Sequence, residues 1–174
     1  MMRNRLRHSF VLLILVLSLT AFAAPNDSSG AAKREKAAPF KLKDQFNNEL
    51  SFEFPRAKPS VLAIADKDGS EQLEAWLRPL IEKYGDKVEF QGVAELSGVP
   101  GIAKGVVRNI IKKKSERAIL LDWKGDVSKS YGFQKDSANL LLIDKQGNIV
   151  ARRTGEADAL RIATFSGEID QLLK

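Results

Sequence analysis

The chain of 174 residues contains no cysteine and a single histidine, His8. Without a thiol it can form no disulfide, no thiolate nucleophile, no cysteine-ligated metal centre and no redox cycle on its own sulfur. The side chains left for catalysis or metal binding are mainly carboxylates, and a group of them lies between residues 66 and 74. The members of this group are Asp66, Asp68, Glu71 and Glu74. The chemistry to consider first is therefore that of clustered carboxylates.

Clustered carboxylates can act as general acids and bases, or they can bind a hard cation such as Ca²⁺. Residues 66–69, Asp-Lys-Asp-Gly, resemble part of an EF-hand loop. If Gly69 is the sixth position of such a loop, Ile64 and Ala75 fall at the first and twelfth positions, and neither side chain is a ligand. The spacing excludes an EF-hand and leaves open a cation site of another type.

The residues on either side of the carboxylates predict the elements that position them. Residues 61–65 are an unbroken apolar run, typical of a central strand that is buried on both faces. Apolar residues then recur with helical spacing, which predicts a helix over 71–84 that ends at Gly85, preceded by a loop over 66–70. The carboxylates would lie where a strand ends and a helix begins, the edge at which open α/β sheets bind ligands.

Acidic residues at the start of a helix also have a simpler explanation. They complement the positive end of the helix dipole, and Ser70 or Asp68 would cap the first turn. Trp76 lies on the apolar stripe of this helix, so we expect it in the core.

The rest of the chain alternates strands and helices. Further strands are predicted within 40–54, 87–95, 118–121, 138–143 and 149–153, and helices within 100–114, 125–131 and 162–173. The helix over 100–114 is expected to turn Val106, Val107, Ile110 and Ile111 inward. The tight turn at 144–148 makes the last two strands an antiparallel hairpin. This order predicts a single α/β domain with a mixed sheet sandwiched by helices.

The first 23 residues have the pattern of a secretory signal peptide. Three arginines precede an apolar run over 10–17, and Ala21-Phe22-Ala23 follows as an A-x-A cleavage site. The run is shorter than the roughly 20 residues of a spanning helix, which favours cleavage over a retained anchor. We expect a signal peptide at 1–23, a flexible linker at 24–38, a folded domain at 39–174, and a periplasmic or secreted location.

Cleavage would change both the catalytic inventory and the charge. It would remove His8, leaving no imidazole for a Ser-His arrangement. It would also remove three arginines and no acid, which lowers the net charge from +6 to +3.

The basic cluster that remains is Lys112-Lys113-Lys114, with Arg108 and Arg117 nearby, and no aromatic residue is interleaved with it to stack on bases. We therefore expect no nucleic-acid partner, and contact with a membrane only through the signal before cleavage. The cluster is explained by the negative end of a helix dipole, with attraction to an anionic membrane surface or a polyanion as a secondary possibility.

Several segments resemble the redoxins, the peroxiredoxin and thiol-disulfide branch of the thioredoxin-like superfamily. Its C-terminal half is similar to YGF, NLLLIDKQGNIV and RRTG within residues 123–155, and its first hairpin and following strand are similar to FKLKDQFNNEL and KPSVLAIA. The VPG at 99–101 and VR at 107–108 are similar to those of a small periplasmic bacterial family among the cysteine-free redoxin-like proteins. The resemblance spans residues 40–174. It implies a thioredoxin-like fold with an N-terminal β-hairpin of redoxin type.

The resemblance also implies where thiols are missing. In dithiol redoxins a Cys-x-x-Cys motif begins the first helix, and a proline follows five residues after the second cysteine. Taking Pro79 as that proline places Glu71 and Glu74 at the cysteine positions, and a register error would move them to Asp68 or Ser70. The proline that redoxins carry beside the active site falls near Ala138 here.

The residues expected at this edge define a candidate groove at the replaced active site. We assign no cofactor, no catalytic residue and no metal to it. Its members are Asp66, Asp68, Ser70, Glu71, Glu74, Trp123 and Ala138. We expect an exported, non-catalytic thioredoxin-like domain that binds a protein or peptide partner in the envelope, in a general or stress-associated role. The alternatives are a redoxin-type oxidoreductase or antioxidant, as the resemblance alone implies, and a purely structural periplasmic protein.

Overall fold

The computed structural model describes residues 35–174 as one folded unit. The predicted signal peptide, and the predicted linker up to residue 34, lie outside the described residues. The strands are β1 (Phe40–Lys43), β2 (Glu49–Phe52), β3 (Ser60–Ala65), β4 (Glu89–Glu95), β5 (Ile119–Asp122), β6 (Asn139–Ile143) and β7 (Ile149–Thr154). The helices are α1 (Lys67–Tyr84), the 3₁₀ turn η1 (Gly101–Ala103), α2 (Lys104–Lys114), α3 (Asp126–Ser130) and α4 (Ala159–Leu172). Among these described residues no helix is long and apolar enough to cross a membrane.

The central sheet is mixed, as the sequence predicted. Its strand order is β5-β4-β3-β6-β7, in which β3, β4 and β5 run parallel and β6 and β7 run antiparallel to their neighbours. Strands β1 and β2 form the separate antiparallel hairpin expected at the start of the domain. Two isolated bridges tie neighbouring segments to the sheet, one from Lys36 to Asn148 and one from Asp44 to Leu120.

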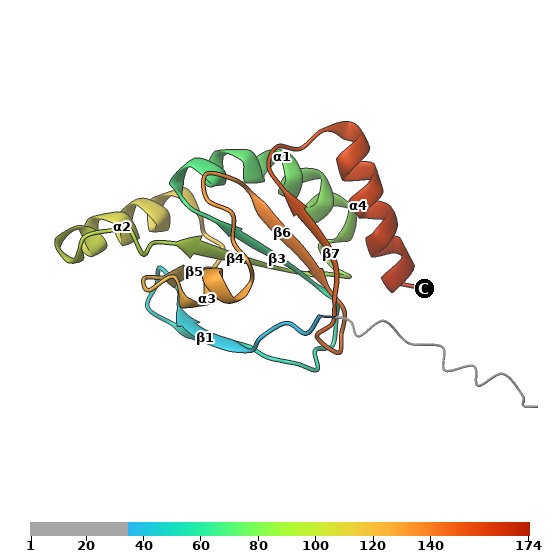
Figure 1. The fold of residues 1–174 in the computed structure, drawn as a ribbon, viewed down its shortest axis with the longest axis horizontal. Helices are drawn as coiled ribbons and strands as arrows, with labels where there is room; N and C mark the ends of the chain where they lie inside the picture. The colour runs from blue at the N-terminus through green and yellow to red at the C-terminus, as the bar shows by residue number, and fades with distance from the viewer. Residues whose placement is uncertain (1–34) are drawn as a thin grey trace, which may run out of the picture. The chain divides into compact units, whose positions relative to one another are not determined.

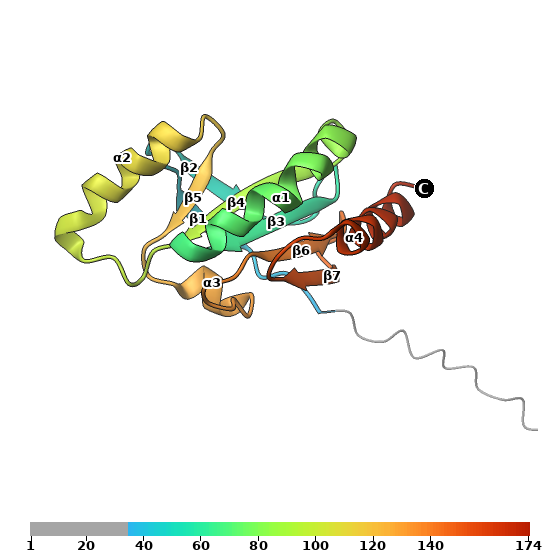
Figure 2. The same cartoon turned by 90° about the horizontal axis from the view of Figure 1, so that it is seen from above.

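Each face of the sheet has its own hydrophobic core. Alternation along β3 sends Val61 to one face and Leu62 to the other, and both are fully buried. Helices α1 and α4 cover the first face, where Trp76 and Phe165 pack edge to face, while the β1–β2 hairpin and α3 cover the second (Figures 1 and 2). Both cores consist of residues between 37 and 173, so the described domain contains the apolar contacts that stabilise it.

The two polar turns at 44–48 and 144–148 share one design. In each, an aspartate side chain accepts hydrogen bonds from the backbone amides two and four residues ahead and from the amide group of the asparagine four residues ahead. Asn47 and Gly147 adopt positive φ values of 74° and 83°, which suits an asparagine or a glycine. Asp144 therefore shapes the tight hairpin turn that the sequence predicted at 144–148.

Three expectations need correction. The last residues of the predicted linker belong to the folded domain: Ala37 is buried, its backbone amide donates to the Gly147 carbonyl at 2.8 Å, and Lys36 bridges to Asn148. Helix α1 begins at Lys67 rather than after a loop ending at residue 70, because Asp66 caps it. The third expectation that fails is the inward packing of α2.

Helix α2 contributes no residue to either core. Val106 and Ile110 were predicted to face inward, but they are 62% and 49% exposed. Of the four side chains predicted to face inward, only Val107 and Ile111 are half-buried. The helix lies at one end of the molecule, next to the edge strand β5, so the protein covers it on one side only (Figures 1 and 2).

Candidate functional site

The sheet topology brings three of the predicted site residues to one edge. Asp66 follows β3 and Trp123 follows β5, and these parallel strands end at the same edge with β4 between them. Ala138 immediately precedes the antiparallel strand β6, which begins at that edge. With neighbouring strands about 4.8 Å apart, the strand ends at Asp66 and Trp123 are separated by roughly 10 Å.

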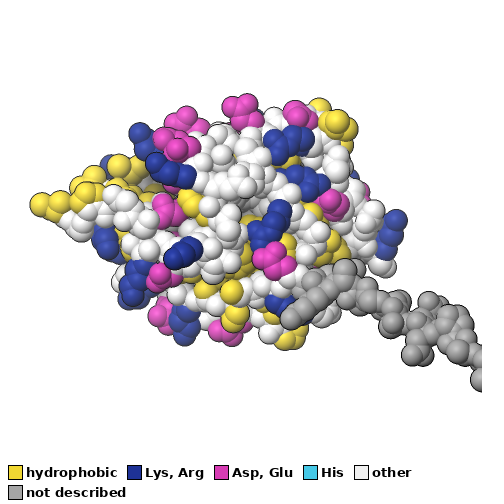
Figure 3. All heavy atoms as spheres, in the orientation of Figure 1, with side chains coloured by type: hydrophobic (Ala, Val, Ile, Leu, Met, Phe, Trp, Pro, Cys, Tyr) yellow, Lys and Arg dark blue, Asp and Glu magenta, His cyan; other side chains and the backbone are white. Residues whose placement is uncertain are grey.

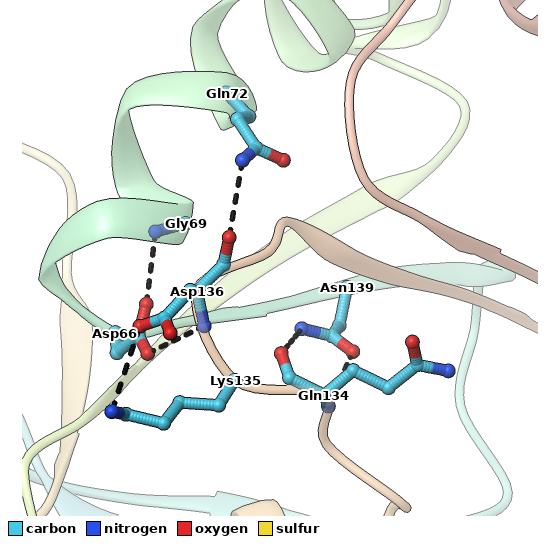
Figure 4. Close-up of polar contacts among 7 residues, drawn as sticks. All are labelled: Asp66, Gly69, Gln72, Gln134, Lys135, Asp136 and Asn139. Carbon is cyan, nitrogen blue, oxygen red and sulfur yellow. Dashed lines mark hydrogen bonds and ion pairs between the residues drawn. The ribbon is translucent and has the colours of Figure 1, made fainter.

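Asp66 joins the start of α1 to the loop that precedes β6. Its Oδ1 accepts a hydrogen bond from the Gly69 amide at 2.9 Å, which is the N-cap interaction, and its Oδ2 accepts one from the Asp136 amide at 2.8 Å (Figure 4). The predicted cap at Ser70 or Asp68 was wrong. Both residues lie in the first helical turn, and the Ser70 hydroxyl donates to the Lys67 carbonyl at 2.6 Å.

Gln72 makes a second connection between the same two segments. Its Nε2 donates to the Asp136 carbonyl at 3.2 Å (Figure 4), and its Oε1 accepts from the Ala138 amide at 3.1 Å. One carboxamide thus pairs with a backbone carbonyl and a backbone amide two residues apart. These are the groups that an extended peptide would pair with if it lay along this loop.

The loop itself is held from its other side by Asn139. The Asn139 side chain donates to the Gln134 carbonyl at 2.9 Å and accepts from the Gln134 amide at 2.8 Å (Figure 4). It also donates to the Ser137 carbonyl at 2.8 Å. Its side chain is nearly fully buried. Residues 134–138 therefore have a conformation fixed by side chains from α1 and from β6.

Gly69 marks how closely the helix and the loop approach each other. It is buried, and a Cβ atom built on it would lie 2.2 Å from the Ser137 carbonyl oxygen. No side chain fits there without moving the backbone. At Gly69 and Ser137, the start of α1 and the loop before β6 are in direct contact, without space for a ligand between them.

Two surface hollows lie elsewhere. One of about 380 Å³ is lined by residues around Pro39, Phe54 and Gly147, and one of about 290 Å³ lies at the C-terminal end of α1 around Gly85. Neither includes a residue of 66–74, Trp123 or Ala138.

The remaining carboxylates of the candidate groove point away from this contact. Asp68, Glu71 and Glu74 are exposed on the outer side of α1, and Glu74 pairs with Arg78 one turn further on. Among residues 35–174, no group of three or more carboxylate or imidazole side chains is close enough to share a metal ion. The structure therefore does not assemble the carboxylate cation site that the sequence left open.

Trp123 belongs to a different part of the same edge. It is half-buried, and the cations of Lys104 and Arg108 from α2 lie 5.3 and 6.0 Å from the centre of its ring. Trp76, by contrast, is fully buried as predicted, with its ring nitrogen donating to the Gly155 carbonyl at 2.8 Å.

The residues that close this edge were not identified from the sequence. Gln72 is the informative case, because it lies one turn before Trp76 on the apolar stripe of α1. A polar side chain on a buried stripe needs hydrogen-bond partners, and that was the available signal. Asp136 and Ser137 gave none, because their roles depend on contacts across about 70 residues of chain.

Asp122, at the end of β5, was also missed. Its carboxylate is buried and accepts hydrogen bonds from the Gly125 amide and from both the amide and the hydroxyl of Ser128, at 2.8 to 2.9 Å. It fixes the chain between Trp123 and α3. All of its hydrogen bonds are made within the domain, which gives it a structural role.

Comparison with solved structures identifies the fold. The putative thiol:disulfide interchange protein DsbE of Chlorobium tepidum superimposes with a TM-score of 0.63 at 20% identity, over 81% of this chain and 97% of that one. The exposed lipoprotein thioredoxin of Streptococcus pneumoniae gives a TM-score of 0.60 at 18% identity, over 78% and 100% of the two chains. The peroxidoxin BcpB of Mycobacterium tuberculosis gives 0.56 at 15% identity, over 80% and 94%.

The chain thus has the thioredoxin-like fold, with an N-terminal hairpin beside the mixed five-stranded sheet. It has no cysteine at any position. No family model matches the sequence, and no curated protein matches it. The similarity to solved structures, at 20% identity or less in these three cases, establishes the fold and not the activity.

Proposed function

We propose that the protein is an exported thioredoxin-like domain without redox chemistry, which acts by binding a protein or peptide partner in the cell envelope. The proposal rests on the close packing of the sheet edge around Asp66 and Ala138 in a chain without thiols. Gln72 pairs the backbone groups of Asp136 and Ala138, and Gly69 touches Ser137, so the interior of this edge is devoted to contacts within the domain. What remains accessible for a partner is the exposed rim.

The rim consists of Asp68, Glu71 and Glu74 on α1 and the half-buried Trp123 after β5. Exposed carboxylates supply charge that selects a basic partner, and a tryptophan supplies apolar area with a hydrogen-bond donor. Export rests on the signal pattern over residues 1–23. One structurally similar protein is described as an exposed lipoprotein, which agrees with a location outside the cytoplasm.

The absence of redox chemistry is tested by measuring peroxide consumption and disulfide reduction by the purified protein with a thiol reductant. We expect rates equal to those of the reductant alone. A rate above that background that is abolished in Glu71→Ala would instead support an oxidoreductase or antioxidant that uses a carboxylate.

Binding through the rim is tested by comparing the envelope proteins crosslinked by the wild type and by a Glu71→Gln, Glu74→Gln, Trp123→Ala variant. A matched control is Glu82→Gln, Glu116→Gln, which removes two exposed carboxylates elsewhere. We expect at least one crosslinked partner to be lost in the rim variant and kept in the control. Identical partner sets in all three proteins would favour the purely structural alternative.

A further inference from the structure

Helix α2 leaves an apolar stripe facing solvent. Ile102, in the 3₁₀ turn that leads into the helix, is 97% exposed, and Val106 and Ile110, which follow at intervals of four residues, are 62% and 49% exposed. Residues four apart lie on one face of a helix, so Val106 and Ile110 form a row on α2, which the exposed Ile102 extends into the 3₁₀ turn. Figure 3 shows hydrophobic side chains gathered at the end of the molecule where α2 lies. We call this row the α2 stripe.

The same segment has an unbalanced charge. Between Glu95 and Glu116 the chain contains no acid, and α2 contains the cations Lys104, Arg108, Lys112, Lys113 and Lys114. Among residues 35–174, none of these cations forms an ion pair with a carboxylate. Their positive charge is therefore available to an external anion.

The cations are placed where they can flank a surface in contact with the stripe. Lys113 and Lys114 are exposed at the end of the stripe, one turn after Ile110. On the side towards the body of the protein, Lys104 and Arg108 lie over Trp123, and Lys112 lies 5.5 Å from the ring centre of Phe46. A helix that combines an apolar row with unpaired cations has the composition of a helix that lies in the surface of an anionic bilayer.

The charge also discriminates between possible occupants of the stripe. A second copy of this chain, packed stripe to stripe, would bring two acid-free helices with five cations each into contact, and like charges at an interface oppose association. A bilayer with anionic lipids supplies both an apolar phase and negative charge. It is the occupant that matches both properties of α2.

We propose that the outer face of α2 docks the protein on an anionic lipid bilayer. Ile102, Val106 and Ile110 enter the region between head groups and acyl chains, and the cations contact the lipid phosphates. The helix is about 16 Å long, too short to span a bilayer, and therefore lies parallel to the surface. Its position at the end of the molecule lets it touch a flat surface (Figure 2). The α2 stripe shares no residue with the rim, although Lys104 and Arg108 of α2 lie over Trp123. The variants that test the two proposals change different residues, so either proposal can fail alone.

The test measures co-sedimentation with vesicles, using the chain that begins at Ala24, which contains both hydrophobic cores and lacks the predicted signal. Vesicles of phosphatidylcholine mixed with phosphatidylglycerol are compared with vesicles of phosphatidylcholine alone. One variant, Ile102→Ser, Val106→Ser, Ile110→Ser, removes the α2 stripe and keeps the charge. A second, Lys112→Gln, Lys113→Gln, Lys114→Gln, removes charge and keeps the stripe.

Two controls match these variants. Leu160→Ser removes an exposed apolar side chain of α4, which is 77% exposed. Lys129→Gln, Lys145→Gln, Lys174→Gln removes three exposed lysines outside α2. Unchanged melting temperatures establish that all variants are folded.

We expect the wild type to bind the anionic vesicles at least about tenfold more tightly than the neutral ones. Each α2 variant should lose at least about tenfold of that affinity, and each control should lose less than about threefold. The proposal would be overturned if the α2 lysine variant and the control lysine variant lost equal affinity for the anionic vesicles. Undiminished vesicle binding by the stripe variant would also overturn it. So would a lipid-free dimer that the stripe variant abolishes, or crosslinking from position 106 to another polypeptide without vesicle binding.

Discussion

Helices α1 and α2 are both amphipathic, yet they use their apolar faces in opposite ways. In α1 the stripe is covered: Trp76 and Leu80 are fully buried, and Tyr84 is 2% exposed. In α2 no residue is buried, and the apolar row from Ile102 to Ile110 faces solvent. The difference comes from their positions in the fold, since α1 packs on the centre of the sheet and against α4, whereas α2 lies beside the edge strand β5.

The comparison separates two uses of one sequence pattern. A covered stripe stabilises the domain, and an uncovered one is available to something outside it. The two helices should therefore respond differently to equivalent substitutions, with α1 controlling stability and α2 leaving it unchanged.

The largest effect is expected from truncating the covered stripe. Trp76→Ala should reduce the free energy of unfolding by about 3 to 5 kcal/mol, because it leaves a large cavity. It also leaves the Gly155 carbonyl without the ring nitrogen that donates to it. The matched change in α2, Val106→Ala, should change the free energy of unfolding by less than about 0.5 kcal/mol. Urea unfolding of both variants measures the difference, and similar losses in the two would show that the solvent-facing row of α2 is in fact covered.

A glycine near the start of each helix sharpens the comparison. Gly69→Ala places a methyl group 2.2 Å from the Ser137 carbonyl oxygen, so the helix start or the loop must move, at a cost of about 1 to 3 kcal/mol. A Cβ on Gly105 meets no atom within 4 Å, and Gly105→Ala should stabilise the protein by about 0.5 to 1 kcal/mol through helix propensity. Thermal unfolding of the two variants should therefore shift in opposite directions. Shifts of the same sign would contradict the close contact at Gly69.

Much of the fold could be predicted from local pattern. The unbroken apolar run of β3, the stripe of α1 and the polar turn at 144–148 each specify their own structure, and the mixed sheet follows from their order. The same reasoning failed for α2, because helical spacing identifies an apolar face and contains no information about what covers it. Val106 and Val107 are equivalent in the sequence, and only the fold distinguishes them.

The sequence predicted the positions of the candidate residues along the chain and not their contacts. Asp66, Trp123 and Ala138 come to one edge of the sheet, at the ends of β3 and β5 and the start of β6. The resemblance directed attention to Glu71 and Glu74, yet both are exposed, and the side chain that reaches the loop is Gln72 between them. The partners of Gln72 are more than sixty residues away in the sequence, and no local rule pairs them.

A smaller effect is expected at the cap of α1. Asp66→Ala removes the acceptor for the amides of Gly69 and Asp136 and should destabilise the protein by about 0.5 to 2 kcal/mol. Hydrogen exchange should accelerate at both of these amides. Ser70→Ala is the control, because its hydroxyl donates only to the Lys67 carbonyl within the same turn. Helix α2 has no side-chain cap, so this contribution exists in α1 alone, and an unchanged exchange rate at Asp136 would count against the link across the edge.

The smallest effect concerns pH and the contact between α1 and α4. The Tyr84 hydroxyl donates to Asp170 Oδ1 at 2.8 Å, and Lys83 Nζ donates to Oδ2 at 3.1 Å. These hydrogen bonds, the one from Tyr84 first, hold the pKa of Asp170 below its ordinary value of 3.8. A carboxyl whose pKa is lower in the folded state stabilises the protein fully above its unfolded pKa. That contribution decreases as the pH falls through the folded value.

Asp170→Asn keeps a carbonyl acceptor for Tyr84 and removes the charge. Its loss of unfolding free energy relative to the wild type should therefore be constant above about pH 5 and should shrink as the pH falls below the ordinary pKa of an aspartate. Urea unfolding across this range measures the change. The α2 variant Val106→Ala is the reference: α2 contains no acid, so its difference from the wild type should not depend on pH. A loss in Asp170→Asn that is equally independent of pH would mean that the carboxylate charge contributes nothing to the contact with α1, and that Tyr84 needs only an uncharged acceptor there.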